Sequence, residues 1–254
     1  LVEPIQGEGG YLVPPEGFLA GLRALCDRHG ILLIFDEVQS GIGRTGRMFA
    51  SEHWGVVPDI ISLAKGLGSG LPIGAVVARR TLMQRWSRGA HGNTYGGNPV
   101  TCAAAIATLD LVEHEYGANA AAMGEHFMGR LRDLAARHDC IAEVRGRGLM
   151  IGMELVEDRR TMAPARELVE ALTTRAFHNG LLLLSCGRST IRFMPPLCVT
   201  RAEIDEAFAI LSAAAVFATT GWWPWRRMPQ PAAAPMAAQA AVAPAAIEIL
   251  DTLR

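Results

Sequence analysis

Short apolar runs alternate with amphipathic stretches along most of this chain, a pattern that predicts an α/β fold with helices covering a mostly parallel sheet. Apolar residues at helical spacing predict a first helix over 16–29, and Gly30 stands where a C-terminal cap belongs. Three short apolar runs, rich in branched residues, predict buried strands at 31–35, 60–63 and 73–78. We expect residues 1–115 to form a large domain.

A smaller α/β domain is expected over 139–218, with 116–138 as a linking helix. Two long amphipathic stretches, 99–114 and 118–137, predict the helices that join the two halves. The elements expected in the smaller domain are strands at 141–144, 150–155, 181–185 and 191–193 and helices at 164–178 and 201–216. Residues 219–254 are rich in Trp, Ala and Pro and lack a periodic apolar pattern, so they are expected to form a linker or tail.

The charge balance points to a small-molecule ligand. The chain carries 24 basic and 25 acidic residues, so nothing favours nucleic acid or an anionic membrane as a partner. Its five cysteines are odd in number and widely scattered, which predicts neither a disulfide framework nor a zinc site. The seven histidines show no metal-ligand spacing, so no metal is expected.

The ends of the sequence bear on location and completeness. No secretory segment and no apolar run of membrane-spanning length is present, which makes the cytoplasm the default expectation. The first residue is Leu1 rather than methionine, and it resembles the end of a strand whose beginning is absent. We therefore expect the chain to lack an N-terminal part.

Two residues that can carry chemistry follow predicted strands. Asp36 ends an apolar run, where a carboxylate is costly to desolvate unless a cation or hydrogen-bond donor meets it. Lys65 comes two residues after the second run. Open α/β sheets bind ligands at the carboxyl ends of their strands, so an acid and an amine are expected at one ligand site. Alternatives are a capping or ion-paired aspartate and a surface lysine.

Four motifs give these residues a context: EPIQGEGG at 3–10, DEVQSGIGRTG at 36–46, AKG at 64–66 and GNTYGGNP at 92–99. In this order and spacing, residues 1–217 resemble the class III (ornithine and 4-aminobutyrate type) aminotransferases of the fold-type I pyridoxal-phosphate enzymes. The resemblance implies pyridoxal 5'-phosphate as cofactor. It also implies a large domain with a mostly parallel sheet, followed by a smaller C-terminal α/β domain.

The resemblance assigns three residues to the cofactor. Lys65 corresponds to the catalytic Schiff-base lysine, which also moves a proton between the substrate and the cofactor. Asp36 corresponds to the carboxylate that keeps the pyridine nitrogen positive, so that the ring accepts electrons. Gln39 corresponds to an amide beside the phenolic oxygen, although a loop-capping role is the alternative.

It assigns three more residues to the phosphate and the substrate. Thr94 matches a threonine that reaches the phosphate of the neighbouring subunit, which implies a homodimer with shared active sites; by itself it reads as a turn residue. Arg192 matches an arginine that grips the substrate α-carboxylate, with a structural salt bridge as the alternative. Glu8 matches a glutamate that pairs with this arginine while an ω-amino substrate is bound. Glu3 receives no derived role, and Arg44 is assigned to loop or subunit packing.

The implied function is a transaminase that moves an amino group from an amine or ω-amino acid to 2-oxoglutarate. The segments 6–10 and 184–187 look most like 4-aminobutyrate aminotransferases. Acetylornithine and ornithine aminotransferases and some amino-acid racemases share the cofactor motifs, so they remain alternatives. A different alternative is an inactive fragment or interaction module, because the family carries a long upstream segment with further cofactor contacts.

Overall fold

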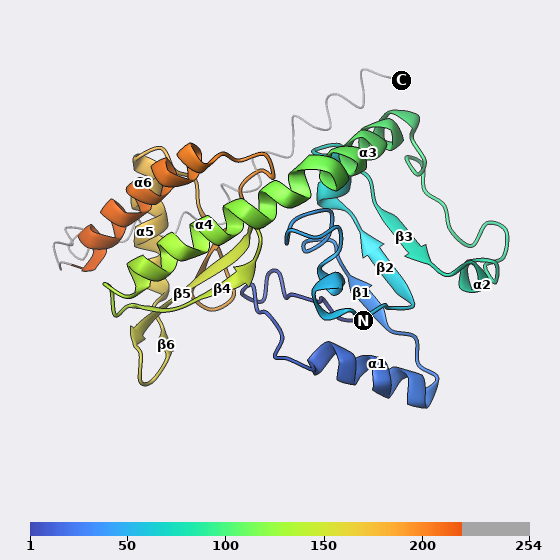
Figure 1. The fold of residues 1–254 in the computed structure, drawn as a ribbon, viewed down its shortest axis with the longest axis horizontal. Coiled ribbons are helices and arrows are strands. Elements are labelled where there is room, and N and C mark those ends of the chain that lie inside the picture. The colour runs from blue at the N-terminus through green and yellow to red at the C-terminus, as the bar shows by residue number, and fades with distance from the viewer. Residues whose placement is uncertain (220–254) are drawn as a thin grey trace, which may run out of the picture. The chain divides into compact units, whose positions relative to one another are not determined.

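The strands of the computed structural model, which describes residues 1–219, form two separate sheets (Figure 1). Nearly all of the predicted tail lies outside the described residues. The elements of the first half are α1 (Phe18–His29), β1 (Ile34–Asp36), η1 (Ala50–Trp54), β2 (Ile60–Leu63), η2 (Lys65–Gly68), β3 (Ala75–Ala78), α2 (Arg80–Met83), α3 (Pro99–Leu111) and η3 (Val112–Tyr116). Those of the second half are α4 (Gly117–Ala135), β4 (Ile141–Arg147), β5 (Met150–Asp158), β6 (Ala163–Pro164), α5 (Arg166–His178), β7 (Leu184–Cys186), β8 (Thr190–Phe193) and α6 (Arg201–Thr219).

The first sheet has the order β1-β2-β3. Strand β1 is parallel to β2, and an isolated bridge between Val2 and Phe35 adds a second parallel pairing, whereas β3 runs antiparallel to β2. In the parallel pair Asp36 stands opposite Ser62. This register places the carboxyl ends of β1 and β2 side by side, as a ligand site of an α/β sheet requires.

Three predicted strands, β1, β3 and β7, begin too early, and for β1 and β7 the helix before the strand takes up the first apolar residue of the run. Helix α1 ends at Gly30, whose φ of 64° lies in the left-handed region, and the N–H of Ile31 donates to Cys26 O at 2.9 Å. This is the Schellman arrangement, which satisfies a free carbonyl at the helix end. Gly180 and Leu181 repeat it at the end of α5. The predicted starts of β1 and β7 are therefore wrong.

The two helices predicted to link the halves form one continuous helix, so the expected interruption between them is wrong. Helices α3 and α4 are joined by the π-helical turn η3, in which Gly117 N–H donates to Val112 O. A Cβ on Gly117 would lie 2.9 Å from that oxygen, so a glycine suits the widened turn. Such turns keep the backbone hydrogen-bonded and often mark functional sites.

The second sheet is antiparallel, with the order β4-β5-β8-β7 and with β6 paired to β5. Helices α4, α5 and α6 gather around it (Figure 1). Its core includes Leu131 from α4, Ile151 from β5, Leu172 from α5 and Leu211 from α6, all of them buried. Within the described residues, no helix has both the length and the apolar character needed to cross a membrane.

We expect Gly124→Ala to destabilise the protein and Gly129→Ala, in the same helix, to stabilise it slightly. A Cβ on Gly124 would lie 2.1 Å from the backbone oxygen of Gly148, so α4 or the β4–β5 turn must shift at a cost of about 1–3 kcal/mol. A Cβ on Gly129 meets nothing within 4 Å, and alanine there gains about 0.4–1 kcal/mol. Urea unfolding followed by circular dichroism measures both, and equal effects would contradict this packing.

Candidate active site

The acid and the amine predicted at one sheet edge follow neighbouring strands. Asp36 is the last residue of β1, and Lys65 comes two residues after the end of β2. The Asp36 carboxylate accepts a hydrogen bond from Val38 N–H at 3.0 Å, which orients it at the strand end. The fold thus brings both residues to the same edge of the first sheet.

Lys65 has an unusual backbone conformation. Its φ of 44° lies in the left-handed region, and it begins the short 3-10 turn η2 that follows β2. Non-glycine residues in this region cost conformational energy and cluster at functional sites, where the surrounding structure enforces them. Lys65 is exposed in the described part of the chain.

A cavity of about 410 Å³ opens beside Lys65. Its walls come from the loop after β1, the turn after β2, the α3–η3 helix and the segment after β8, and they include Gln39, Arg44, Lys65, Val112, Tyr116 and Leu197. This volume is within the range of small-molecule sites. Asp36 is not among the lining residues.

Glu8, Gln39 and Arg192 form a connected polar group. Arg192 and Gln39 both donate to Glu8 Oε1, the amide of Gln39 at 3.1 Å. The pKa of the Glu8 carboxyl is lowered, chiefly by the hydrogen bond from Arg192, with further contributions from Gln39 and the charge of Lys65. The structure therefore joins Glu8, Gln39 and Arg192 by hydrogen bonds, close enough to Lys65 for its charge to act on Glu8.

Two buried atoms of this group have no hydrogen-bond partner among the described residues: Gln39 Oε1 and Arg192 Nε. Buried polar atoms are almost always paired, so these two are available to a further polar group. The backbone approaches Gln39 closely here, since a Cβ on Gly7 would lie 2.6 Å from the amide. Glu3 holds this segment by accepting from Gly7 N–H at 2.5 Å, which gives it a structural role.

Thr94 stands apart from the other predicted residues. It is exposed in the loop between α2 and α3, and no hydrogen bond in the described part of the chain joins it to Lys65, Asp36 or Gln39. The neighbouring Asn98 caps α3, because its side chain accepts from Val100 N–H at 2.9 Å. A contact of Thr94 with a second subunit stays a prediction.

Glu37 is a key residue that the sequence did not single out. It is fully buried, and its carboxylate accepts from the hydroxyl of Ser40 at 2.7 Å and from the N–H groups of Ala50 and Ser51 at 2.9 Å each. Successive side chains of a strand point to opposite faces, so of two adjacent acids one enters the interior. This alternation is the signal that could have found Glu37.

Arg44 fixes the glycine-rich loop at 41–46. Its guanidinium donates to Pro195 O at 2.6 Å and to Leu149 O at 3.2 Å, which agrees with the predicted role in loop packing. Burial lowers its pKa to about 10, so the side chain remains charged at neutral pH. The loop after β1, which forms one wall of the cavity beside Lys65, is thereby tied to the second sheet.

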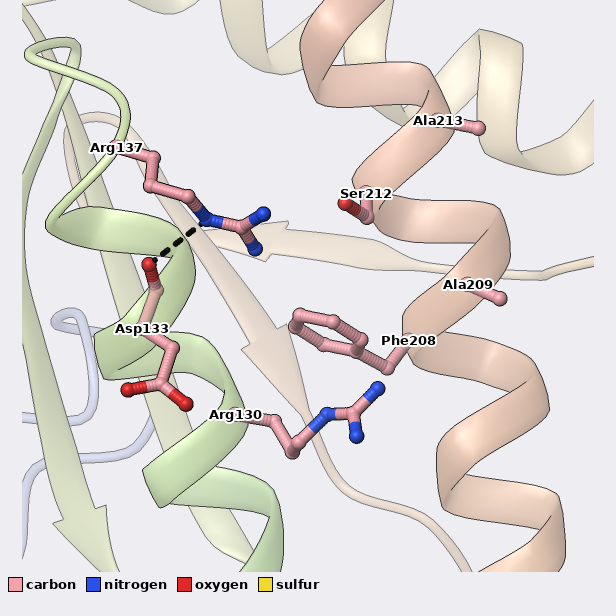
Figure 2. Close-up of a pocket in the computed structure, with 7 residues that line it drawn as sticks. All are labelled: Arg130, Asp133, Arg137, Phe208, Ala209, Ser212 and Ala213. Atoms are coloured by element: carbon pink, nitrogen blue, oxygen red, sulfur yellow. Dashed lines mark hydrogen bonds between the residues drawn. The ribbon is translucent and has the colours of Figure 1, made fainter.

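A larger cavity, about 520 Å³, lies between α4 and α6 and contains none of the predicted site residues. Figure 2 shows Arg130 of α4, and Arg137 of the segment that follows α4, on the side facing α6. The Arg130 guanidinium lies 4.4 Å from the centre of the Phe208 ring. Among the described residues, this second cavity is lined by no lysine, and its one carboxylate is that of Asp133 on α4. The volume of a cavity therefore does not by itself identify the candidate active site.

Comparison with known proteins identifies the family. The family model described as aminotransferase class-III matches residues 1–215. The chain belongs to the class-III aminotransferases. This class-III chain is 46% identical over 215 residues to the 5-aminovalerate aminotransferase DavT of Pseudomonas aeruginosa, covering 84% of the chain and 50% of that protein. It is also 46% identical over 213 residues to the acetylornithine aminotransferase of Corynebacterium efficiens, with coverage of 84% and 50%.

Solved transaminase structures share the fold. An amine transaminase from an uncultivated Pseudomonas species, solved in its PLP-bound form, superposes with a TM-score of 0.80 at 42% identity, covering 85% of this chain and 51% of that one. The ornithine delta-aminotransferase of Plasmodium falciparum gives a TM-score of 0.78 at 34% identity, covering 85% and 56%. These likenesses confirm the predicted fold-type I architecture. The class-III chain spans about half the length of the curated relatives it matches.

We expect Glu37→Gln to lower the free energy of unfolding by about 1.5–3 kcal/mol, since a buried, charge-assisted hydrogen-bond acceptor is lost and an amide donor faces backbone N–H groups. Asp36→Asn is the matched control. It keeps an oxygen for Val38 N–H and is expected to change stability by less than about 1 kcal/mol. Urea titration compares the two, and a control as unstable as Glu37→Gln would argue against separate roles for these acids.

Proposed function

We propose that this chain carries the catalytic lysine and the carboxylate-binding arginine of a pyridoxal-phosphate-dependent transaminase. The supporting observation is the convergence of a strained Lys65, a Gln39 amide with an unpartnered buried oxygen and the Glu8–Arg192 ion pair. Membership of the family and the PLP-bound form of a similar enzyme support the same cofactor. Because the relatives are about twice as long, the activity of the whole enzyme is part of the proposal.

The residues present fit the cofactor. Pyridoxal phosphate, when bound, supplies an aldehyde that condenses with amines and a ring that accepts electrons. The Asp36 carboxylate would hold a proton on the ring nitrogen, and Lys65 Nζ would bind the aldehyde carbon. Gln39 has one amide N–H engaged by Glu8 and a second that can orient the phenolic oxygen. Its unpartnered oxygen can accept a hydrogen bond from a further polar group.

Lys65 also carries the proton transfer. With the cofactor in place, Lys65 Nζ would take the proton from the substrate carbon that bears the amino group and deliver it to the cofactor carbon that had been the aldehyde, acting as base and then as acid. The short turn of η2 fixes the starting point of the side chain at the end of β2. The reacting atoms therefore meet an amine whose backbone position is held by the sheet.

Arg192 and Glu8 together allow one site to bind two substrates that differ in whether they carry an α-carboxylate. Arg192 binds Glu8 through one terminal nitrogen and leaves Nε unpaired. An α-carboxylate that displaces Glu8 can bind two parallel N–H groups of the guanidinium fork, whereas a donor without an α-carboxylate leaves Glu8 in place to neutralise the arginine. The pair thus lets one site accept an amine in one half-reaction and 2-oxoglutarate in the other.

The closed pair favours donors whose reacting carbon carries no carboxylate, such as 4-aminobutyrate-like ω-amino acids. The relatives act, by their names, on 5-aminovalerate and acetylornithine, so an acetylornithine or ornithine donor is the second candidate. A racemase fits less well, because its substrate carries a carboxylate on the reacting carbon. The alternative of an inactive fragment or interaction module is decided by the labelling experiment below.

A homodimer with shared active sites belongs to the proposal. Its support is the exposed position of Thr94, which within one chain reaches no other predicted site residue in the described part. A threonine placed this way suits a phosphate bound by a neighbouring subunit. The cytoplasmic location stays a prediction.

Lys65 is the single lysine of the chain, which makes the cofactor linkage easy to test. After incubation with pyridoxal phosphate and reduction with borohydride, we expect one added pyridoxyl phosphate group, located on Lys65 by peptide mass spectrometry. Lys65→Arg keeps the charge and should carry no such group. Labelling confined to the N-terminal amine, or equal labelling of both proteins, would sink the proposal and favour the inactive fragment.

We expect Arg192→Met to impair the keto-acid half-reaction selectively. Loss of a charge-assisted pair should lower kcat/KM for 2-oxoglutarate by about 10- to 100-fold, with a smaller effect on 4-aminobutyrate. Glu8→Gln should do the reverse, because Arg192 then lacks its counter-charge when the donor is bound. Single-turnover absorbance changes measure each half-reaction, and equal losses for both substrates would contradict the assigned roles.

A further inference from the structure

Three residues lie in register across the second sheet. Arg145 on β4 stands opposite Gly152 on β5, and Gly152 stands opposite Arg192 on β8. Directly paired residues of neighbouring strands point to the same face of a sheet. Two arginines therefore share one face, separated by a position that has no side chain.

The loop that carries Glu8 lies on this glycine. A Cβ on Gly152 would lie 3.1 Å from Cβ of Tyr11 and 3.3 Å from Gly10 O, so a larger residue would push the loop away. Arg145 donates to Gly10 O from Nε at 3.0 Å and from a terminal nitrogen at 2.6 Å. On the other side, Gly187 N–H donates to Glu8 O at 2.8 Å. The backbone around Glu8 is thus held from two directions.

Arg145 is itself firmly held. The same terminal nitrogen that reaches the loop contacts the Glu154 carboxylate at 2.6 Å and the Thr190 hydroxyl at 3.0 Å, and Thr190 donates to Glu154 at 2.6 Å. Burial by itself would raise the pKa of Glu154, but the hydrogen bonds from Thr190 and Arg145 outweigh it and lower the pKa. Only 9% of the Arg145 side chain is exposed. The anchor is therefore a covered ion pair rather than a mobile surface contact.

We propose that Arg145 is a positioning residue, which holds the backbone of the Glu8 loop over the second sheet so that only the side chain of Glu8 moves on and off Arg192. The inference rests on the proposed function, in which that movement distinguishes the two substrates. Arg145 donates no hydrogen bond to Glu8 or to Arg192, so it acts through Gly10. Without the Arg145 side chain, the backbone of the Glu8 loop is less well positioned, and Glu8 pairs with Arg192 for a smaller fraction of the time.

The test uses Arg145→Lys, Arg145→Met and the control Arg147→Met. Lysine keeps the charge, but a single ammonium cannot bond Gly10, Glu154 and Thr190 with the geometry of a guanidinium fork. The control removes an equal charge from an exposed position of the same strand. Carboxyl NMR titration, with the Glu8 signal assigned by Glu8→Gln, reports how closely Glu8 stays paired with Arg192.

Both Arg145 variants should raise the pKa of Glu8 toward that of an exposed glutamate, and the control should leave it unchanged. In the holoenzyme, kcat/KM for 4-aminobutyrate should fall about tenfold, while that for 2-oxoglutarate stays equal or rises because Glu8 competes less. A merely structural lesion would lower both values in proportion. The ratio of the two thus separates positioning from general damage.

Folded Arg145→Lys protein with the unaltered Glu8 pKa and an unaltered substrate ratio would overturn the inference. If the Arg145 variants do not fold, Thr190→Val removes only one contact of the anchor and should produce a smaller shift in the same direction; no shift overturns the inference as well. If Lys65 of the unaltered chain takes no label while the Glu8 pKa still responds to Arg145, the proposed function fails and the positioning role stands.

Discussion

The ion pair between Glu8 and Arg192 is the interaction on which the candidate site depends, because it joins the loop before α1 to the second sheet. Two-thirds of the Glu8 side chain is exposed, and ion pairs of this kind contribute only about 0–1 kcal/mol to stability. Stability therefore does not explain why the pair forms with Arg192 Nε left unpaired and buried. The proposed replacement of Glu8 by a substrate carboxylate would account for both features.

Around the Glu8–Arg192 pair, other arginines hold the backbone of the loops that form the site. Arg44 ties the glycine-rich loop to the backbone oxygen of Leu149, just before β5, and to that of Pro195, just after β8. Gly148 approaches the same loop so closely that a Cβ would lie 2.4 Å from Thr45. Arg145 does the same for the Glu8 loop. Movable side chains on a fixed backbone are what a site needs if it is to bind two substrates in turn without losing its catalytic geometry.

The adjacent acids at the end of β1 show how one strand serves both the site and the fold. Asp36 stays at the sheet edge with a single backbone donor, so its second oxygen is left for a ligand. Glu37 turns inward and satisfies a hydroxyl and two N–H groups at the start of η1, which shapes the loop that follows Gln39. One strand end thus supplies a ligand group and the internal support of the wall beside it.

The sequence alone determined the α/β class and most of the helices and strands, because hydrophobic periodicity is a property of neighbouring residues. Its motifs also singled out five candidate site residues: Lys65, Asp36, Gln39, Glu8 and Arg192. It misplaced the starts of β1 and β7 and divided the long helix, since a Schellman end and a π turn reuse the same apolar residues and glycines. Only the tertiary structure decided that Glu37 enters the interior, that Lys65 is exposed, and that Arg145 holds the Glu8 loop. The Arg145 contact joins residues 135 positions apart, and the burial of Glu37 depends on how the loop after β1 folds back on it, which no local pattern encodes.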